Sequence, residues 1–424
     1  MVIIGTVGVL AFAALGVRQT LNSASSAPSR VLFGLLQLAV LTFATIGVLD
    51  TLRGSALRGI RALGSTGRMV PVDNPIFRTT MELLTGTPLT PGNMPEVMTC
   101  GDQLYPRLWG DLRSAQRSIS IQLYYCEPGR MAEEMRALLV ERSQTGVRVF
   151  VLVDAFGAED MPVAWLSSLR NAGVEVATFR PIHWWSLNRA NNRSHVRAIA
   201  IDREVGYTGG FGLADKWFGD GRSRDEWRDT SVRFTGPAVG QLLAAFAIAW
   251  AEATGDLLTV DTTPDELTPA GSRSGKRGVT RPVTSGVDTM PVAGFLLTPP
   301  SLGSTRAERF LSLSIAAARH RLYISNAYFV PDTSFRRLLE KAAKAGVDVR
   351  VITAGPATDV RTMLYAGRAR YTALLKAGVR IYEYVPSMMH AKTIVVDGLW
   401  SAIGSMNFDN RSMVLNDEAN FVSL

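Results

Sequence analysis

The chain has 424 residues, of which 47% are hydrophobic and 19% are charged. This length and apolar content exclude a disordered tail and predict a large core and more than one domain. The net charge of +8 favours an anionic partner, which could be a phospholipid surface, a phosphate ester or a nucleic acid. The two cysteines, Cys100 and Cys126, are too few for a disulfide framework or a cysteine zinc cage, so we expect core thiols.

Two uncharged apolar runs open the chain, residues 1–17 and residues 31–49. The second run is just long enough to cross the roughly 30 Å of hydrocarbon in a bilayer, and neither run shows the amphipathic period of a core helix. A signal peptide is the alternative for the first run, but no basic segment precedes its apolar core and a second run follows at once. The sequence therefore predicts two transmembrane helices within residues 1–50 and a juxtamembrane segment over residues 51–92.

The basic residues near these runs are distributed unevenly. Four arginines lie between residues 53 and 68, whereas only two lie between the apolar runs. By the positive-inside rule, this asymmetry places the bulk of the chain in the cytoplasm. We therefore expect a multi-pass protein of the cell membrane with its main domains on the cytoplasmic side.

From about residue 93 the chain alternates predicted helices and strands, and the pattern occurs twice. The matched segments are Ser118–Gly129 with Arg321–Asp332, Thr145–Ala155 with Ala345–Gly355, Asn171–Pro181 with Lys376–Pro386, and Ser194–Gly212 with Met389–Asn407. Residues 261–290 are rich in Pro, Ser, Thr and Gly without hydrophobic periodicity, which indicates a linker. The sequence predicts a duplicated α/β fold, with lobes at 93–260 and 291–424 that each hold a mixed or mainly parallel sheet flanked by helices.

The last matched segments carry a histidine, a cation two residues later and an aspartate. These candidate catalytic residues are His195, Arg197 and Asp202 in the first copy, and His390, Lys392 and Asp397 in the second. Because side chains alternate along a strand, each histidine faces the same way as its cation, so both can meet one ligand. Asp397 would face the other way, and the Asp397-Gly398 dipeptide before a second apolar run is typical of a tight hairpin. We therefore expect Asp397 to shape that turn.

Two histidines that face one shared cleft can process a phosphodiester. One attacks phosphorus as a nucleophile, while the other protonates the leaving alcohol and later deprotonates the incoming one. Histidine suits both tasks because its pKa lies near neutral pH. The cations and the turn donors Ser405 and Asn407 would neutralise the phosphoryl oxygens, so no metal or other cofactor is required. A lone histidine on an apolar strand is more often a core residue, but two copies at equivalent places in a repeat favour a site.

These motifs resemble the phospholipase D superfamily, whose signature is HxKxxxxD followed by a glycine-rich turn. Within it the chain is most similar to bacterial cardiolipin synthases, above all in the stretch "HAKTIVVDGLWSAIGSMNFDNRSMVLNDEAN". The resemblance implies two phospholipase D-like α/β lobes related by a pseudo-twofold axis, with the first histidine as nucleophile and the second as acid. It also implies a set of phosphate-binding or orienting residues, which are Ser405, Asn407, Glu418, Asp229 and Gly210. Glu418 is expected to orient His390, and Asp229 to orient His195.

The first motif departs from the family pattern at two positions. Arg197 stands where the pattern has lysine; it keeps the charge, but its planar fork is not equivalent to an ammonium. Gly212 stands where an asparagine usually follows the paired glycines, which removes one donor. The sequence also ends at Leu424, just past the second motif, where the resembling proteins usually continue with further helices.

The favoured hypothesis is a membrane-bound phosphatidyltransferase that joins two phosphatidylglycerol molecules into cardiolipin. Its expected partners are a phospholipid substrate and the membrane bilayer. One alternative is a phospholipase D-type hydrolase that uses water, or a nuclease of the same superfamily, although the apolar runs argue against a nucleic acid partner. The other alternative is a non-catalytic lipid-binding relative.

Overall fold

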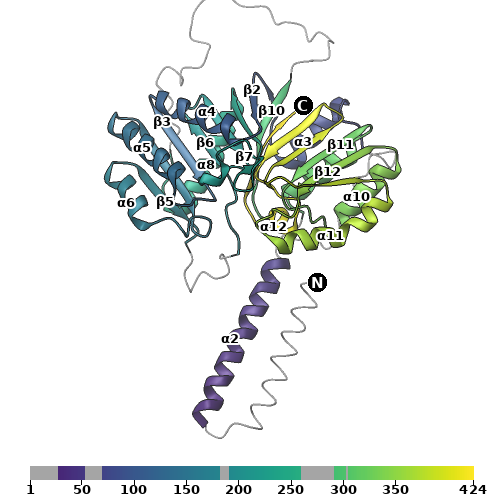
Figure 1. Ribbon diagram of the computed structural model, residues 1–424, viewed down its shortest axis with the longest axis horizontal. Coiled ribbons are helices and arrows are strands. Elements are labelled where there is room, and N and C mark those ends of the chain that lie inside the picture. The colour runs from purple at the N-terminus through teal and green to yellow at the C-terminus, as the bar shows by residue number, and fades with distance from the viewer. Residues whose placement is uncertain (1–26, 53–68, 182–190, 259–290, 302–303) are drawn as a thin grey trace, which may run out of the picture.

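The computed structural model describes residues 27–52, 69–181, 191–258, 291–301 and 304–424. Two α/β lobes lie side by side, and the long helix α2 (Ala27–Leu52) projects away from them (Figure 1). The C-terminal strand lies near the junction of the lobes (Figure 1). The duplicated α/β fold predicted from the sequence is thus confirmed.

The first lobe is built around a seven-stranded mixed sheet. Its elements are β2 (Met94–Met98), α4 (Gly101–Ser114), β3 (Ser118–Leu123), α5 (Arg130–Gln144), β4 (Arg148–Asp154), α6 (Val163–Asn171), β5 (Glu175–Phe179), β6 (Ala198–Ile201), β7 (Val205–Gly209), the 3-10 helix η1 (Asp215–Trp217), β8 (Trp227–Arg228), β9 (Ser231–Thr235) and α8 (Ala238–Thr254). The strand order is β2-β9-β7-β6-β3-β4-β5. Strands β3, β4 and β5 are parallel, as helical crossovers require, and the other neighbours are antiparallel.

The second lobe repeats this order with one strand added. Its elements are α3 (Pro75–Thr85), β1 (Thr90–Pro91), β10 (Val292–Thr298), α9 (Arg306–Ala317), β11 (Arg321–Asn326), α10 (Thr333–Lys344), β12 (Asp348–Ala354), α11 (Arg361–Lys376), β13 (Arg380–Tyr384), β14 (Met388–Met389), β15 (Lys392–Val396), β16 (Trp400–Gly404), α12 (Asn410–Val414) and β17 (Glu418–Ser423). The sheet order is β1-β10-β17-β16-β15-β11-β12-β13. Strand β1 pairs with β10, and α3 packs in the same core as α9. The segment expected to be juxtamembrane therefore contributes a helix and a strand to this lobe.

The central strands of the first sheet are buried on both faces because that sheet is covered on both sides. In the first lobe, one face packs against α4, α5 and α6, as the shared cluster of Leu108, Leu139 and Val151 shows. The other face packs against α8, where Phe150 meets Trp250, and against the second lobe, where Phe234 of β9 lies 4.7 Å, centroid to centroid, from Phe421 of β17. Burying large aromatic side chains is among the strongest contributions to a core, so this contact fixes the two lobes against each other. Strands β9 and β17, which hold matching positions in the two sheets, therefore pack against each other.

The expected transmembrane hairpin is not confirmed. Residues 1–17 and the arginine-rich stretch at 53–68 lie outside the described residues, as does most of the predicted linker. The second apolar run falls within α2. Among the helices that the structure describes, none is both long and apolar enough to cross a membrane.

Candidate active site

Both motif histidines line one cavity between the lobes. His195 lies just before β6 and His390 just before β15, and their exposed fractions are only 6% and 3%. The cavity has a volume of about 710 Å³ and is lined by both histidines, Arg197 and Asn407, among others. The expectation of a single cleft shared by both halves agrees with this placement.

Each histidine is bound to a carboxylate of the opposite lobe. His195 Nδ1 lies 2.9 Å from Glu418 Oε2, and His390 Nδ1 lies 2.8 Å from Asp229 Oδ2. The sequence-based pairing of Glu418 with His390 and of Asp229 with His195 is therefore wrong. The structure does bring these four residues together in two pairs, but the partners are exchanged between the halves.

The main chain explains the exchange. Ser194 forms an isolated parallel bridge with Asp417, so His195 N donates to Asp417 O at 2.8 Å. In the other half, β14 pairs in parallel with β8, and His390 N donates to Arg228 O at 2.7 Å. His195 thus lies beside Asp417, which precedes Glu418 in the chain. In the same way, His390 lies beside Arg228, which precedes Asp229. This contact brings each carboxylate to the histidine across the interface.

The two cations differ in what they bind. Arg197 Nη1 lies 3.1 Å from His195 Nε2 and 3.4 Å from the main-chain oxygen of His195, whereas Lys392 Nζ donates to the main-chain oxygen of His390. A guanidinium can only donate, so His195 Nε2 must be the acceptor and its proton must reside on Nδ1, facing Glu418. Arg197 Nε is buried without a hydrogen-bond partner among the described residues. The Arg197 guanidinium therefore keeps an unused donor beside the His195 ring, suited to an anionic oxygen.

Burial keeps both imidazoles neutral. It lowers the pKa of His195 well below the usual value and the pKa of His390 to about 3, and Lys392 acts in the same direction on both. Burial also lowers the pKa of Lys392 to about 7, although Asp229 opposes that shift. A neutral imidazole has a free lone pair, which is the form that a nucleophile or a base requires.

The two carboxylates are in different electrostatic states. Burial raises the pKa of Glu418 to about 7, against the hydrogen bond from Ser405. Burial alone would also raise the pKa of Asp229, but His390, Lys392 and the Trp217 indole together hold it below its usual value. The Asp229 carboxylate is therefore ionised at neutral pH, whereas the Glu418 carboxylate gains a proton as the pH falls through about 7.

The glycine-rich turns support the carboxylates in two ways. The register pairs Gly404 with Asn420 and Gly209 with Ser231, so Ser405 and Gly210 occupy equivalent positions. Ser405 Oγ donates to Glu418 Oε2 at 2.5 Å. At Gly210, a Cβ would lie 2.2 Å from Asp229 Oδ1, so only glycine leaves room for this carboxylate. Both turns, as expected, lie against the site.

The missing asparagine of the first turn also has a structural explanation. Asn407 lines the cavity, and its Oδ1 is buried without a partner among the described residues. At the equivalent position, a Cβ on Gly212 would lie 2.8 Å from the Trp217 ring. That indole donates to Asp229 Oδ2 at 2.9 Å. Trp217 thus fills the place of the absent side chain and supplies the Asp229 carboxylate with a donor.

The motif aspartates are not part of the cavity. Asp397 accepts from the main-chain N–H groups of Arg319, His320 and Arg321 at 2.7–2.8 Å. Asp202 does the same for residues 116–118 at 2.7–2.9 Å. Both adopt positive φ, at 54° and 53°. The turn-shaping role expected of Asp397 is confirmed, and we correct the catalytic assignment of both aspartates, because their carboxylates are occupied by the loop before the central strand.

The sequence analysis missed the aromatic side chains around the histidines. The Tyr124 ring lies 4.8 Å from His195, and the rings of Trp227, Trp217 and Tyr328 lie 5.1, 5.4 and 6.3 Å from His390. Tyr328 has a detectable signal, since it aligns with a tyrosine in the first copy of the repeat. These rings exclude water and fix the imidazole planes. Among the described residues, no cluster of three or more His, Cys, Asp or Glu side chains is placed to hold a metal.

The doubled α/β fold and its two carboxylate-bound histidines are features of the phospholipase D class. The chain belongs to the family described as "Cardiolipin synthase, PLD-like domain", whose model matches residues 108–227 and 311–423. It is 31% identical to a cardiolipin synthase of Geobacillus kaustophilus over 83% of this chain and 67% of that protein. It is also 31% identical to a cardiolipin synthase A of Pseudomonas syringae, over 80% of this chain and 66% of that protein.

The chain therefore spans about two thirds of the length of these curated relatives. A crystal structure of phosphatidylserine synthase from Haemophilus influenzae is similar in fold, with a TM-score of 0.59 at 13% identity, and covers 82% of this chain and 86% of that one. At this level of identity, the likeness is one of fold alone.

We predict that Gly212→Ala destabilises the protein. The added Cβ would displace the Trp217 ring, and overpacking of this kind costs about 1–3 kcal/mol. Gly240→Ala is the control, because this α8 glycine has open space around its Cβ position and alanine favours a helix by about 1 kcal/mol. Thermal unfolding of both variants measures the difference. Equal stability of the two variants would contradict the packing role of Gly212.

Proposed function

We propose that this protein is a cardiolipin synthase-like phosphatidyltransferase that acts through a phosphohistidine. The proposal rests on one observation above all: a neutral His195 has its Nε2 lone pair directed at a buried cation, and His390 lines the same cavity. Transfer of a phosphoryl group requires a nucleophile, an acid and a positive charge around phosphorus. Family membership and the named relatives support this reaction class.

In the first step, His195 Nε2 attacks the phosphorus of a phosphatidylglycerol. The N–P bond forms as the bond between phosphorus and the glycerol oxygen breaks. His390 must enter this step as the imidazolium, which the ionised Asp229 and the anionic phosphodiester favour, and its Nε2 proton passes to the leaving oxygen. Arg197 Nη1 moves its hydrogen bond from His195 Nε2 to a phosphoryl oxygen, which frees the lone pair for attack. The Nε–H of Arg197, which has no partner among the described residues, is a further donor. Glu418 holds His195 Nδ1–H, which keeps the ring oriented as the phosphoimidazole forms. Asp229 stabilises charge on His390 in the same manner.

In the second step, an alcohol replaces glycerol. A hydroxyl of a second phosphatidylglycerol loses its proton to His390, attacks phosphorus and releases His195, which gives cardiolipin and free glycerol as the net products. Water could attack the same intermediate, so the alcohol must be bound well or concentrated. Holding the cavity at a lipid surface raises the effective concentration of lipid alcohols.

We further propose that the protein works at the cell membrane with its lobes on the cytoplasmic side. Helix α2 carries exposed apolar side chains, including Val31, Leu35 and Phe43 at 63%, 59% and 56% exposure, and it projects from the lobes (Figure 1). Apolar surface of this kind typically marks an interaction with a membrane or a protein. The excess of arginine after the apolar runs in the sequence supports the cytoplasmic orientation.

The overall reaction is tested by giving purified protein phosphatidylglycerol in mixed micelles. We expect equimolar cardiolipin and glycerol, measured by lipid mass spectrometry and an enzymatic glycerol assay. Phosphatidic acid as the dominant product at all lipid concentrations would replace the transferase with a hydrolase. Binding of phosphatidylglycerol without turnover would instead favour the non-catalytic relative.

The roles of the histidines can be separated with a substrate whose leaving group needs no proton. In a nitrophenyl phosphodiester lipid, the leaving group departs as the nitrophenolate anion and needs no acid. His390→Ala should therefore still give a burst of nitrophenolate and a trapped phosphohistidine. His195→Ala should give neither, because it lacks the nucleophile. With phosphatidylglycerol, both variants should be nearly inactive, and the double variant little worse than either. A burst from His195→Ala but not from His390→Ala would reverse the assignment.

The pH dependence should depend on Lys392. Its pKa of about 7 means that the ammonium loses its charge as pH rises through neutrality, so kcat/KM should fall on the alkaline side. Lys392→Arg keeps a charge at all accessible pH values, and we expect its alkaline limb to move upward by a unit or more, on the order of the pKa difference between the two groups. Lys341→Arg on α10 is the control and should leave the profile unchanged. An alkaline limb that Lys392→Arg does not move would belong to another group.

A further inference from the structure

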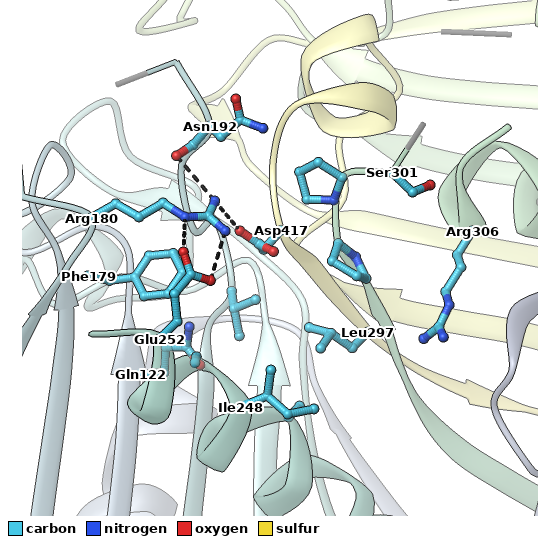
Figure 2. A pocket seen from close by; sticks show the side chains of 15 residues that line it. Gln122, Phe179, Arg180, Asn192, Ile248, Glu252, Leu297, Ser301, Arg306 and Asp417 are labelled. Atoms are coloured by element: carbon cyan, nitrogen blue, oxygen red, sulfur yellow. Dashed lines mark hydrogen bonds and ion pairs between the residues drawn. The ribbon is translucent and has the colours of Figure 1, made fainter. Parts of the chain in front are cut away.

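A second pocket lies between the lobes beside residues 192–196, and an ion-pair cluster of partly buried side chains lies at one end of it. The pocket has a volume of about 510 Å³, and Figure 2 shows Arg180 between Glu252 and Asp417 at one end of it. Arg180 Nη1 lies 2.7 Å from Asp417 Oδ2, and Arg180 Nε lies 2.7 Å from Glu252 Oε1. Arg180 and Glu252 belong to the first lobe, whereas Asp417 belongs to the second. The cluster therefore links the two lobes.

Asp417 connects this cluster to the catalytic pair through its own backbone. Its main-chain oxygen accepts from His195 N at 2.8 Å, and its N–H donates to Arg193 O at 3.0 Å. Asp417 and Glu418 are consecutive residues at the start of β17 in extended backbone, so their side chains point to opposite sides. One side chain reaches Arg180 and the next reaches His195.

We propose that Arg180, with Glu252 and Asp417, forms an interlobe clamp that positions Glu418 against His195. The clamp residues are positioning residues, since none of them contacts the imidazole with its side chain. Glu418 has one more rotatable bond than the aspartate in the other half, so its orientation depends more strongly on a fixed backbone. The proposal rests on the function proposed for His195.

Among the residues that the structure describes, the other half of the site shows no matching clamp. Arg228 takes the place of Asp417 beside His390, and its guanidinium donates to Asp229 O at 2.6 Å and Thr230 Oγ1 at 3.5 Å. Within the described part of the chain, Arg228 makes no ion pair. The short Asp229 is held instead by the Trp217 indole and by Thr230 N. The two carboxylates are thus fixed by different means, and only Glu418 depends on the opposite lobe's arginine.

Arg180 and Asp417 are both charged at neutral pH, so their ion pair is present there. Burial raises the pKa of Asp417 to about 6, and Arg180 opposes that shift. Burial also acts to lower the pKa of Arg180, but Glu252 and Asp417 outweigh it and leave the pKa raised. Removing the guanidinium would leave the mostly buried Asp417 carboxylate facing that of Glu252 without a positive charge between them, which favours withdrawal of Asp417 and, with it, of Glu418.

The test compares Arg180→Met with Arg233→Met. Arg233 Nε lies 2.6 Å from Asp111 Oδ2, and the side chains of that pair are 14% and 13% exposed, as are those of Arg180 and Asp417. Both variants lose an equally buried ion pair, but Arg233 and Asp111 lie within the first lobe and outside the catalytic cavity. A purely structural role for Arg180 would make the two variants behave alike once both are shown to fold.

Two readouts separate the clamp from general stability. With phosphatidylglycerol, Arg180→Met should lower kcat by about tenfold or more, equivalent to about 1.4 kcal/mol, with KM changed far less, while Arg233→Met stays near wild type. In protein labelled with 15N-histidine, the Nδ1–H resonance of His195, identified by its loss in His195→Ala, should shift or broaden in Arg180→Met. The resonance of His390 should remain in place.

The resonance readout requires no turnover, so it decides the proposal even if the protein proves not to be a transferase. An unchanged His195 resonance in Arg180→Met would overturn the clamp. So would a kcat loss no larger than that of Arg233→Met in an active protein. Absence of cardiolipin formation by the wild type, with the resonance shift intact, would reject the proposed function and leave the clamp supported.

Discussion

The exchange of carboxylates between the lobes is the constraint on which the rest of the structure depends. His195 is bound by Glu418 and His390 by Asp229, so neither lobe contains a complete histidine–carboxylate pair. The short main-chain bridges beside the histidines and the aromatic core between the sheets hold the lobes in the one arrangement that completes both pairs. The site is therefore a property of the interface rather than of either repeat.

That interface carries an unusual density of buried charge. Two carboxylates, a lysine and an arginine lie within the same site at 5% exposure or less. Removing each ion from water costs several kcal/mol, which only close partners can offset. The balance keeps both imidazoles neutral and leaves the Lys392 ammonium poised to lose its proton near pH 7. Ionisable groups whose pKa values are strongly shifted, and which line a cavity, are typical of catalytic sites.

The two halves of the site use different residues at equivalent positions. Ser405 supports Glu418 in one half, whereas Gly210 and Trp217 accommodate Asp229 in the other. Arg197 contacts an imidazole nitrogen in addition to the main-chain oxygen of its histidine, whereas Lys392 contacts the main-chain oxygen of His390. A duplicated fold thus provides two histidines in different environments, as a reaction that needs a nucleophile and an acid requires. The departures from the family pattern in the first motif belong to this asymmetry.

The sequence by itself determined the repeat, the order of helices and strands within it, and the histidines, cations and turn residues of the site. These are local properties, because strand alternation and turn chemistry act over a few neighbouring residues. It did not determine which carboxylate meets which histidine, or that Asp202 and Asp397 serve the backbone of a distant loop. Those contacts join residues far apart in the chain, and Glu418 reaches His195 only because the lobes pack face to face. Tertiary packing alone decided the pairing.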